Sequence, residues 1–167
     1  MPVAPSAELL LADPDGISWD DLQSFDWVRA LESCPQDPVH HAEGNVAIHT
    51  RMVLETLRAM PGYRALPLAE RQVVFLACLM HDVGKPATTR REDDGRITAK
   101  GHSRAGELLT RRIFWELGVP FDLREQVCGL IRYHQIPFFL ITRDDAQKVA
   151  AEVSCSARCD LLALVAE

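Results

Sequence analysis

Residues 73–86 read VVFLACLMHDVGKP, and this stretch decides how the chain folds. Its apolar residues close a segment with helical character that begins near Leu68, and His81 and Asp82 follow at once. Gly84 then ends the helix. A helix that is apolar on all sides lies inside the protein, so it carries an imidazole and a carboxylate into the core. Those two groups need partners there, because burying them unpaired costs several kcal/mol.

Two further predicted helices also present a histidine to the core. Over residues 45–60, one stripe with helical period contains His49, so we expect His49 to be buried; the stripe is Val46, His49, Val53, Leu57 and Met60. Over residues 123–134, an apolar stripe ends on His134. A lone histidine on an apolar face is usually a core residue that donates to a carbonyl. Three such histidines beside an aspartate favour a divalent transition metal, which prefers these ligands.

Composition and charge narrow the class of protein. The 167 residues suit one domain with a proper core, and 47% of them are hydrophobic. The net charge of −6 argues against a dedicated nucleic-acid scaffold and against DNA-specific binding, although it allows a local basic patch. We see no apolar run of membrane length and no signal-peptide pattern, and we expect a cytoplasmic protein without membrane contacts. The odd number of cysteines, five, suits reduced thiols.

The remaining segments predict an all-α fold with one short β-hairpin. An irregular start runs through Gly16, and a helix capped near Ser18 follows. Asp93-Asp94-Gly95 is a turn signal between residues 87–90 and 96–99, which predicts a hairpin flap. Further helices are expected over residues 103–117, 121–134 and 142–153, and from residue 157 onward.

These residues resemble the HD-domain metal-dependent phosphohydrolases, whose signature is a His, a His-Asp doublet at the end of the next helix, and a distant Asp. His49, His81 and Asp82 match that signature. Residues 40–46 and 80–86, HHAEGNV and MHDVGKP, are similar to the HD domain of bacterial tRNA nucleotidyltransferases. Residues 133–139, YHQIPFF, resemble the HD domain of bifunctional HD/polynucleotide-kinase RNA-end-repair proteins. The resemblance covers residues 35–167 and implies an HD-domain helical bundle.

The resemblance also implies the metal chemistry. His49, His81 and Asp82 would hold a divalent ion, which the ligand types allow to be manganese, nickel, cobalt, iron or zinc. Asp82 could bridge to a second ion. His102 and His134 match positions that either complete this second site or contact the substrate phosphate, and both alternatives remain open.

The implied reaction is hydrolysis of a phosphate ester on a nucleotide or an RNA end, either a 2′-phosphate or a 2′,3′-cyclic phosphate. The candidate catalytic residues are Asp82, Lys85 and His102, and the candidate substrate contacts are His41, Lys85, Arg96, His102 and His134. Lys85 either neutralises a phosphate or is a solvated charge at a helix end. His41 either shuttles a proton, contacts the substrate, or has no role. Arg96 belongs to a basic flap whose interspersed acidic residues favour a plain solvated hairpin.

The closing aspartate of the family is expected beyond Glu167, after an apolar helix like residues 161–167. Asp160 precedes that place by about nine residues and would face another side of the helix, so we expect a structural role for it. We therefore expect one HD domain over residues 1–167, covalently linked to a C-terminal domain in a longer protein. The alternative function is a non-catalytic, metal-stabilised or nucleotide-sensing module of a larger RNA-processing enzyme.

Overall fold

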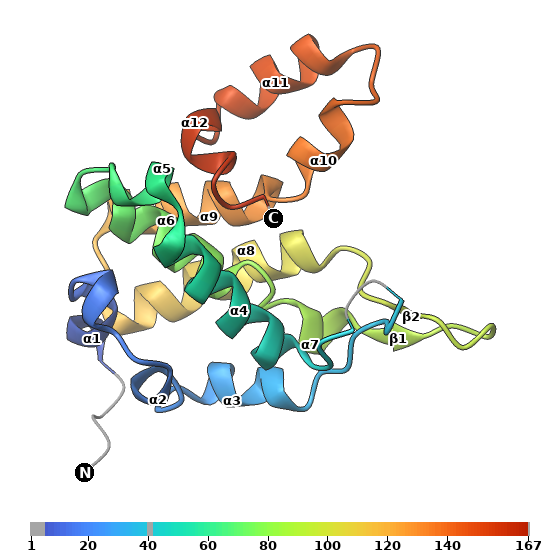
Figure 1. The fold of residues 1–167 in the computed structure, drawn as a ribbon, viewed down its shortest axis with the longest axis horizontal. Coiled ribbons are helices and arrows are strands. Elements are labelled where there is room, and N and C mark those ends of the chain that lie inside the picture. The colour runs from blue at the N-terminus through green and yellow to red at the C-terminus, as the bar shows by residue number, and fades with distance from the viewer. Residues whose placement is uncertain (1–5, 40–41, 167) are drawn as a thin grey trace.

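The computed structural model describes residues 6–39 and 42–166 as a bundle of helices with one small hairpin (Figure 1). The all-α class with a short hairpin is thus confirmed. In chain order the helices are α1 (Ala7–Leu11), the 3₁₀ helix η1 (Pro14–Gly16), α2 (Trp19–Leu22), α3 (Asp26–Glu32), α4 (Val46–Ala59), α5 (Pro61–Arg64), α6 (Leu68–Met80), α7 (Lys85–Thr88), α8 (His102–Leu117), α9 (Phe121–Tyr133), α10 (Ile136–Leu140), α11 (Ala146–Ser154) and α12 (Cys159–Leu162).

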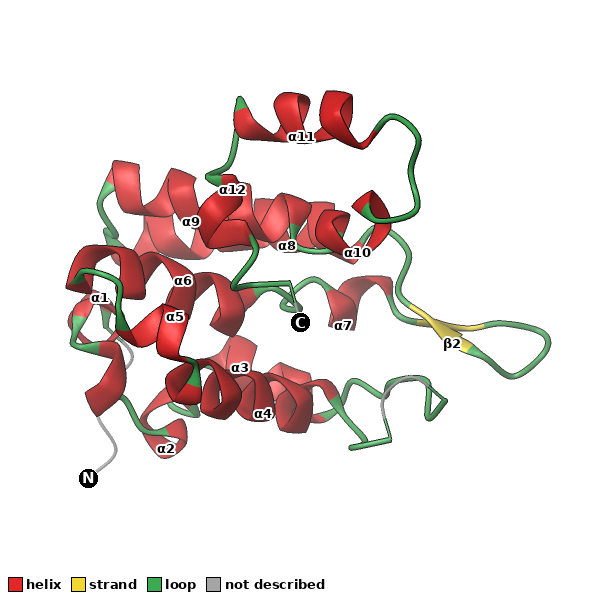
Figure 2. Cartoon of the chain, turned by 45° about the horizontal axis from the view of Figure 1, so that its top comes forward, coloured by secondary structure: helices red, strands yellow, loops and turns green. Residues whose placement is uncertain are grey.

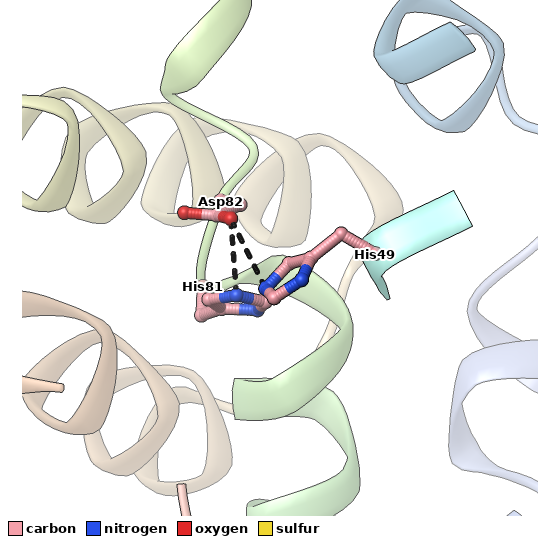
Figure 3. A group of neighbouring side chains, drawn as sticks. All are labelled: His49, His81 and Asp82. Atoms are coloured by element: carbon pink, nitrogen blue, oxygen red, sulfur yellow. Dashed lines mark ion pairs between the residues drawn. The ribbon is translucent and has the colours of Figure 1, made fainter. Parts of the chain in front are cut away.

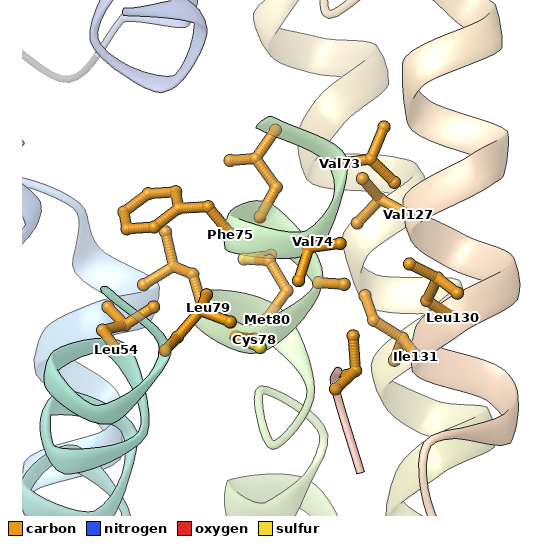
Figure 4. Close-up of a cluster of buried hydrophobic side chains, with 14 of the residues drawn as sticks. Leu54, Val73, Val74, Phe75, Cys78, Leu79, Met80, Val127, Leu130 and Ile131 are labelled. Atoms are coloured by element: carbon orange, nitrogen blue, oxygen red, sulfur yellow. The ribbon is translucent and has the colours of Figure 1, made fainter. Parts of the chain in front are cut away.

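The central element is α6, which contacts α4 on one side and α9 on the other. Every residue from 73 to 80 is buried, as the apolar run predicts. Figure 4 shows Leu79 beside Leu54 of α4, and Val74 facing Val127 of α9. The end of α6 therefore lies between the two neighbouring helices, and His81 follows as its C-terminal cap residue.

The buried face of α4 is not the stripe predicted from the sequence. Asn45 caps the helix by accepting a hydrogen bond from Ile48 N at 2.9 Å. The residues that are buried on α4 are Val46, Ala47, Thr50, Leu54 and Leu57. The helix is rotated about its axis relative to the prediction, so that Thr50 and Leu54 are buried and Val53 lies at the edge of the buried face. His49 consequently lies at its edge with 17% of its side chain exposed, and the prediction of a buried His49 is wrong.

Helices α8 and α9 form an antiparallel pair, and α9 packs against α6. Gly118 ends α8 in the left-handed conformation, with φ of 75°. The predicted helices over residues 103–117 and 121–134 are confirmed: α8 begins one residue earlier than predicted, and α9 ends one residue earlier. Because the two helices run in opposite directions, the start of α8 at His102 and the end of α9 at His134 lie at the same end of the bundle.

The hairpin and the C-terminal helices are shorter than predicted. Strands β1 (Arg90–Arg91) and β2 (Ile97–Thr98) pair antiparallel, and Figure 2 shows the hairpin extending away from the helices. The first strand was expected over residues 87–90, but residues 87 and 88 belong to α7, so β1 begins at Arg90. Instead of a helix from residue 157 onward, the described residues of this segment form the short α12. None of the helices in the described part of the chain has both the length and the apolar composition needed to span a membrane.

A close backbone contact fixes the chain that leaves α6. A Cβ atom on Gly84 would lie 2.3 Å from His102 O and 2.5 Å from Gly106 N. Only glycine permits this approach. The contact holds the residues that follow Asp82 against the first turns of α8, and so it places His102 next to the His-Asp doublet.

We predict that Gly84→Ala lowers the free energy of unfolding by at least about 2 kcal/mol, because backbone atoms cannot move aside as a flexible side chain can. Gly16→Ala is the matched control, since a Cβ there meets nothing within 4 Å. Its effect should stay within about 0.5 kcal/mol. Urea unfolding monitored by circular dichroism measures both values, and equal midpoints for the two variants would contradict the prediction.

Candidate metal centre

His49, His81 and Asp82 come together at the end of α6 (Figure 3). The Oδ2 atom of Asp82 lies 3.1 Å from His81 Nε2 and 3.8 Å from His49 Nε2. His49 reaches this point from the edge of α4, which faces α6. The structure therefore places the three residues of the predicted signature in one cluster.

A second group of side chains shares the same carboxylate. The Oδ1 atom of Asp82 lies 3.3 Å from His102 Nε2, and His102 Nε2 lies 3.3 Å from His134 Nε2. Within each of the two groups, the ligand atoms all lie within 4.8 Å of one another. Asp82 stands in both groups with a different oxygen toward each, as a bridging carboxylate would.

Hydrogen bonds on the far side of each ring fix the orientation of the histidines. The Nδ1 atoms of three of them donate to the carbonyl three residues earlier: His81 to Cys78 O at 2.7 Å, His102 to Ala99 O at 2.8 Å, and His134 to Ile131 O at 2.8 Å. A carbonyl only accepts, so each Nδ1 carries a proton. The Nε2 atoms of His81 and His102 face Asp82, and that of His134 faces His102. His49 Nδ1 lies 2.7 Å from Glu43 Oε1, a carboxylate–histidine pairing that is typical of metal ligands.

The charge state of Asp82 suits a cation. Burial alone would raise the pKa of Asp82, but His81, Lys85 and His102 together hold it well below its ordinary value. The carboxylate is therefore ionised although only 2% of it is exposed. Lys85 Nζ approaches Oδ2 to 2.7 Å, yet Oδ2 has no partner with hydrogen-bond geometry among the described residues. A buried anionic oxygen without a hydrogen bond is an unfavourable arrangement that a metal ion would relieve.

The histidines differ in their affinity for a proton. Burial opposes protonation of His81, but the adjacent Asp82 carboxylate and the Cys78 carbonyl outweigh it and raise the pKa of His81. Burial, together with repulsion from His81, lowers the pKa of His134 to about 3. Burial also lowers the pKa of His102 and of His49. His102 and His134 are consequently neutral near pH 7, with their single proton on Nδ1.

The neutral state of His102 and His134 shows whether these residues fit a metal ion. Two neutral imidazoles face each other through unprotonated Nε2 atoms 3.3 Å apart, so two lone pairs repel unless a cation lies between them or beside them. Two nitrogen ligands of one tetrahedral ion are roughly 3.4 Å apart, because each lies about 2.1 Å from the metal. The donor set of imidazoles and a carboxylate is also the set that divalent transition metals prefer. The residues present therefore fit a divalent ion.

An open pocket of about 370 Å³ adjoins the cluster. Lys85 and His102 line the wall nearest Asp82, and Thr98 and Lys100 line the wall on the hairpin side. The remaining walls include Gln36, Asp37 and Gln135, which sequence reasoning missed. These three lie in loops or at helix ends, where no periodic pattern marks a residue as facing inward.

Other predicted site residues lie elsewhere. Arg96 is at the end of the hairpin, with its Nε 2.6 Å from Asp94 Oδ2, and it does not line the pocket. Among the described residues, the structure thus brings Arg96 to no other candidate residue of the site. His41 lies outside the described residues. Asp160 is exposed and pairs with Arg158, in keeping with the structural role that we expected for it.

Comparison with known proteins bears on the same region. A family model described as "HD domain" matches residues 46–162. The multifunctional CCA protein of Psychromonas ingrahamii is 29% identical over 112 residues, or 67% of this chain and 25% of that protein. The multifunctional CCA protein of Halorhodospira halophila is 34% identical over 107 residues, or 64% of this chain and 23% of that protein. The CC-adding tRNA nucleotidyltransferase of Thermus thermophilus is 44% identical over 61 residues, or 35% of this chain and 14% of that protein.

The similarity to HD domains of bacterial tRNA nucleotidyltransferases is thus confirmed, and the chain spans about a quarter of the length of the first two relatives. No solved structure matches the chain significantly. The resemblance of residues 133–139 to RNA-end-repair proteins stays a prediction.

We predict that His81→Ala and Asp82→Ala each abolish binding of Mn²⁺, because each removes a ligand, and Asp82→Ala removes the one that both groups share. Asp160→Ala is the matched control, since it removes a carboxylate that is exposed and paired with Arg158. Isothermal titration and metal analysis after dialysis give the affinity and the number of ions. Retention of tight binding by Asp82→Ala, or its loss in Asp160→Ala, would contradict this placement of the site.

Proposed function

The chain belongs to the HD-domain family, and we propose that it is a metal-dependent phosphohydrolase that acts on the phosphate of a nucleotide or an RNA end. The observation that carries the proposal is the pair of His/Asp groups sharing Asp82. The pocket beside them has room for a phosphorylated ligand, and Lys85 and His102 lie in its wall.

Within this proposal, His49, His81 and Asp82 hold the first ion. When bound, a divalent ion lowers the pKa of a water molecule and polarises a phosphoryl oxygen. Lys85 supplies a positive charge for the phosphate from the pocket wall. His102 and His134 have the two roles that the sequence left open: they hold a second ion with Asp82, or they contact the phosphate.

The two alternatives for His102 differ in what its Nε2 does. Of the four clustered histidines in the described ranges, only His102 lines the pocket. If His102 is no ligand, its unprotonated Nε2 accepts a proton from the attacking water or a hydrogen bond from a protonated phosphate. His134 does not line the pocket, but its Nε2 contacts the Nε2 of His102 at 3.3 Å. The contact between their Nε2 atoms favours the role of joint ligands.

The substrate class rests on the relatives. Two of them are named as CC-adding and A-adding tRNA nucleotidyltransferases, and added nucleotides extend an RNA at its end. We propose that this chain hydrolyses a 2′-phosphate or a 2′,3′-cyclic phosphate, the forms in which phosphate occurs at such ends. A covalently linked C-terminal domain that presents the RNA belongs to the same proposal.

We predict that the chain hydrolyses 2′,3′-cyclic AMP, 2′-AMP or p-nitrophenyl phosphate when Mn²⁺, Ni²⁺ or Co²⁺ is added, and that EDTA removes the activity. Asp82→Ala should lower kcat/KM by at least about 1,000-fold, because the ion supplies most of the catalysis. Asp160→Ala should keep the wild-type rate. Tight metal binding without hydrolysis of any of the three compounds would refute the proposal, and would favour a metal-stabilised or nucleotide-sensing module.

A further inference from the structure

Gln36 is a buried loop glutamine that follows an exposed proline. It is 6% exposed, whereas its neighbour Pro35 is exposed. The loop is closed at its base by a β-bridge between Pro35 and Asn45, and by a hydrogen bond from Val46 N to Cys34 O at 3.1 Å. A buried amide is costly unless both of its ends find partners.

Both ends of the Gln36 side chain do find partners. Its Oε1 accepts a hydrogen bond from Lys85 Nζ at 2.6 Å, and its Nε2 donates to Asn45 O at 3.5 Å. An ammonium group only donates and a carbonyl only accepts, so these two partners fix which end of the amide is oxygen. Gln36 thus connects the base of the loop to the first residue of α7.

The consequence for Lys85 is a fixed ammonium group. Its Nζ lies between Gln36 Oε1 at 2.6 Å and Asp82 Oδ2 at 2.7 Å, and 12% of its side chain is exposed. A lysine stem is flexible and ordinarily carries its charge into water. With Gln36 removed, the ammonium of Lys85 would keep only its ion pair with Asp82 among the described residues, and it would be free to turn about that contact.

The absence of charge on the Gln36 side chain is as important for phosphate binding as the position of that side chain. An amide oxygen holds the ammonium without cancelling its charge, whereas a second carboxylate would cancel it and repel an approaching anion. Gln36 and Lys85 also line the same pocket next to His102. We propose that Gln36 is a positioning residue that holds the Lys85 ammonium in the pocket wall, where it binds the phosphate group of the substrate. The phosphate part of this inference rests on the proposed function.

The test uses inorganic phosphate as the probe, titrated by calorimetry into the Mn²⁺-loaded protein. Gln36→Met keeps the size and removes the acceptor, and we expect it to weaken phosphate binding about 10-fold, the cost of losing a hydrogen bond to a charged group. Gln36→Glu keeps the acceptor but adds a negative charge, so it should weaken binding further. In a Lys85→Met background, Gln36→Met should change the affinity less than about twofold, because the group that it positions is gone.

Gln72→Met is the matched control. Gln72 is a partly buried glutamine whose Nε2 donates to Leu11 O at 2.6 Å, away from the pocket. The Gln72→Met variant loses one side-chain hydrogen bond, as Gln36→Met does, so we expect a similar fall in melting temperature. Its phosphate affinity should equal that of the wild type. Metal content is measured for every variant, so that loss of the ion is not mistaken for loss of Lys85.

Three results would overturn the inference: no phosphate binding by the wild type, an unchanged affinity in Gln36→Met, or an equal loss with and without Lys85. Failure of the proposed function gives a different result. In that case the wild-type protein binds phosphate, and its phosphate affinity depends on Gln36 through Lys85, as inferred. The protein nevertheless hydrolyses none of the phosphate esters.

Discussion

The ionised carboxylate of Asp82, buried at the end of the central helix, is the constraint on which the rest of the structure depends. A charge in this position is tolerable only if positive or polar groups surround it. The Nε2 atoms of His49, His81 and His102 and the Nζ of Lys85 all lie within 4 Å of its two oxygens. His49 belongs to α4, His81 caps the end of α6, and Lys85 and His102 are the first residues of α7 and α8, so segments between residues 49 and 102 meet at one side chain.

The surrounding fold makes this cluster rigid. Each of three histidines follows or starts a helix and donates its Nδ1 proton to a carbonyl of the preceding turn, so its ring is held by the backbone and not by packing alone. The contact between Gly84 and the start of α8 fixes the distance between two of these helix ends. A metal ligand set that is preorganised in this way loses little conformational entropy when the ion binds. The same rigidity explains how the Nε2 atoms of two neutral imidazoles can be held 3.3 Å apart.

The sequence predicted the parts of this arrangement that depend on local pattern. The apolar run over residues 73–80 identified the central helix, and the residue types identified the metal-ligand candidates, because both signals are contained in a short segment. Prediction from the sequence failed for features that depend on tertiary packing. The buried face of α4 is turned by one position because Thr50 and Leu54 face the core, and no periodicity distinguishes that face from the predicted one. Gln36 was missed because its burial depends on Lys85, which is 49 residues away.

The central claim is that Asp82 and the histidines around it bind a divalent ion. Crystals grown with saturating Mn²⁺, with diffraction data collected at the manganese absorption edge, test it most directly. We predict an anomalous peak within bonding distance of an Asp82 oxygen and of the Nε2 atoms of His49 and His81. A second peak beside His102 and His134 would assign those two residues as ligands as well. Crystals with no anomalous peak at Asp82, despite saturating Mn²⁺, would contradict the claim.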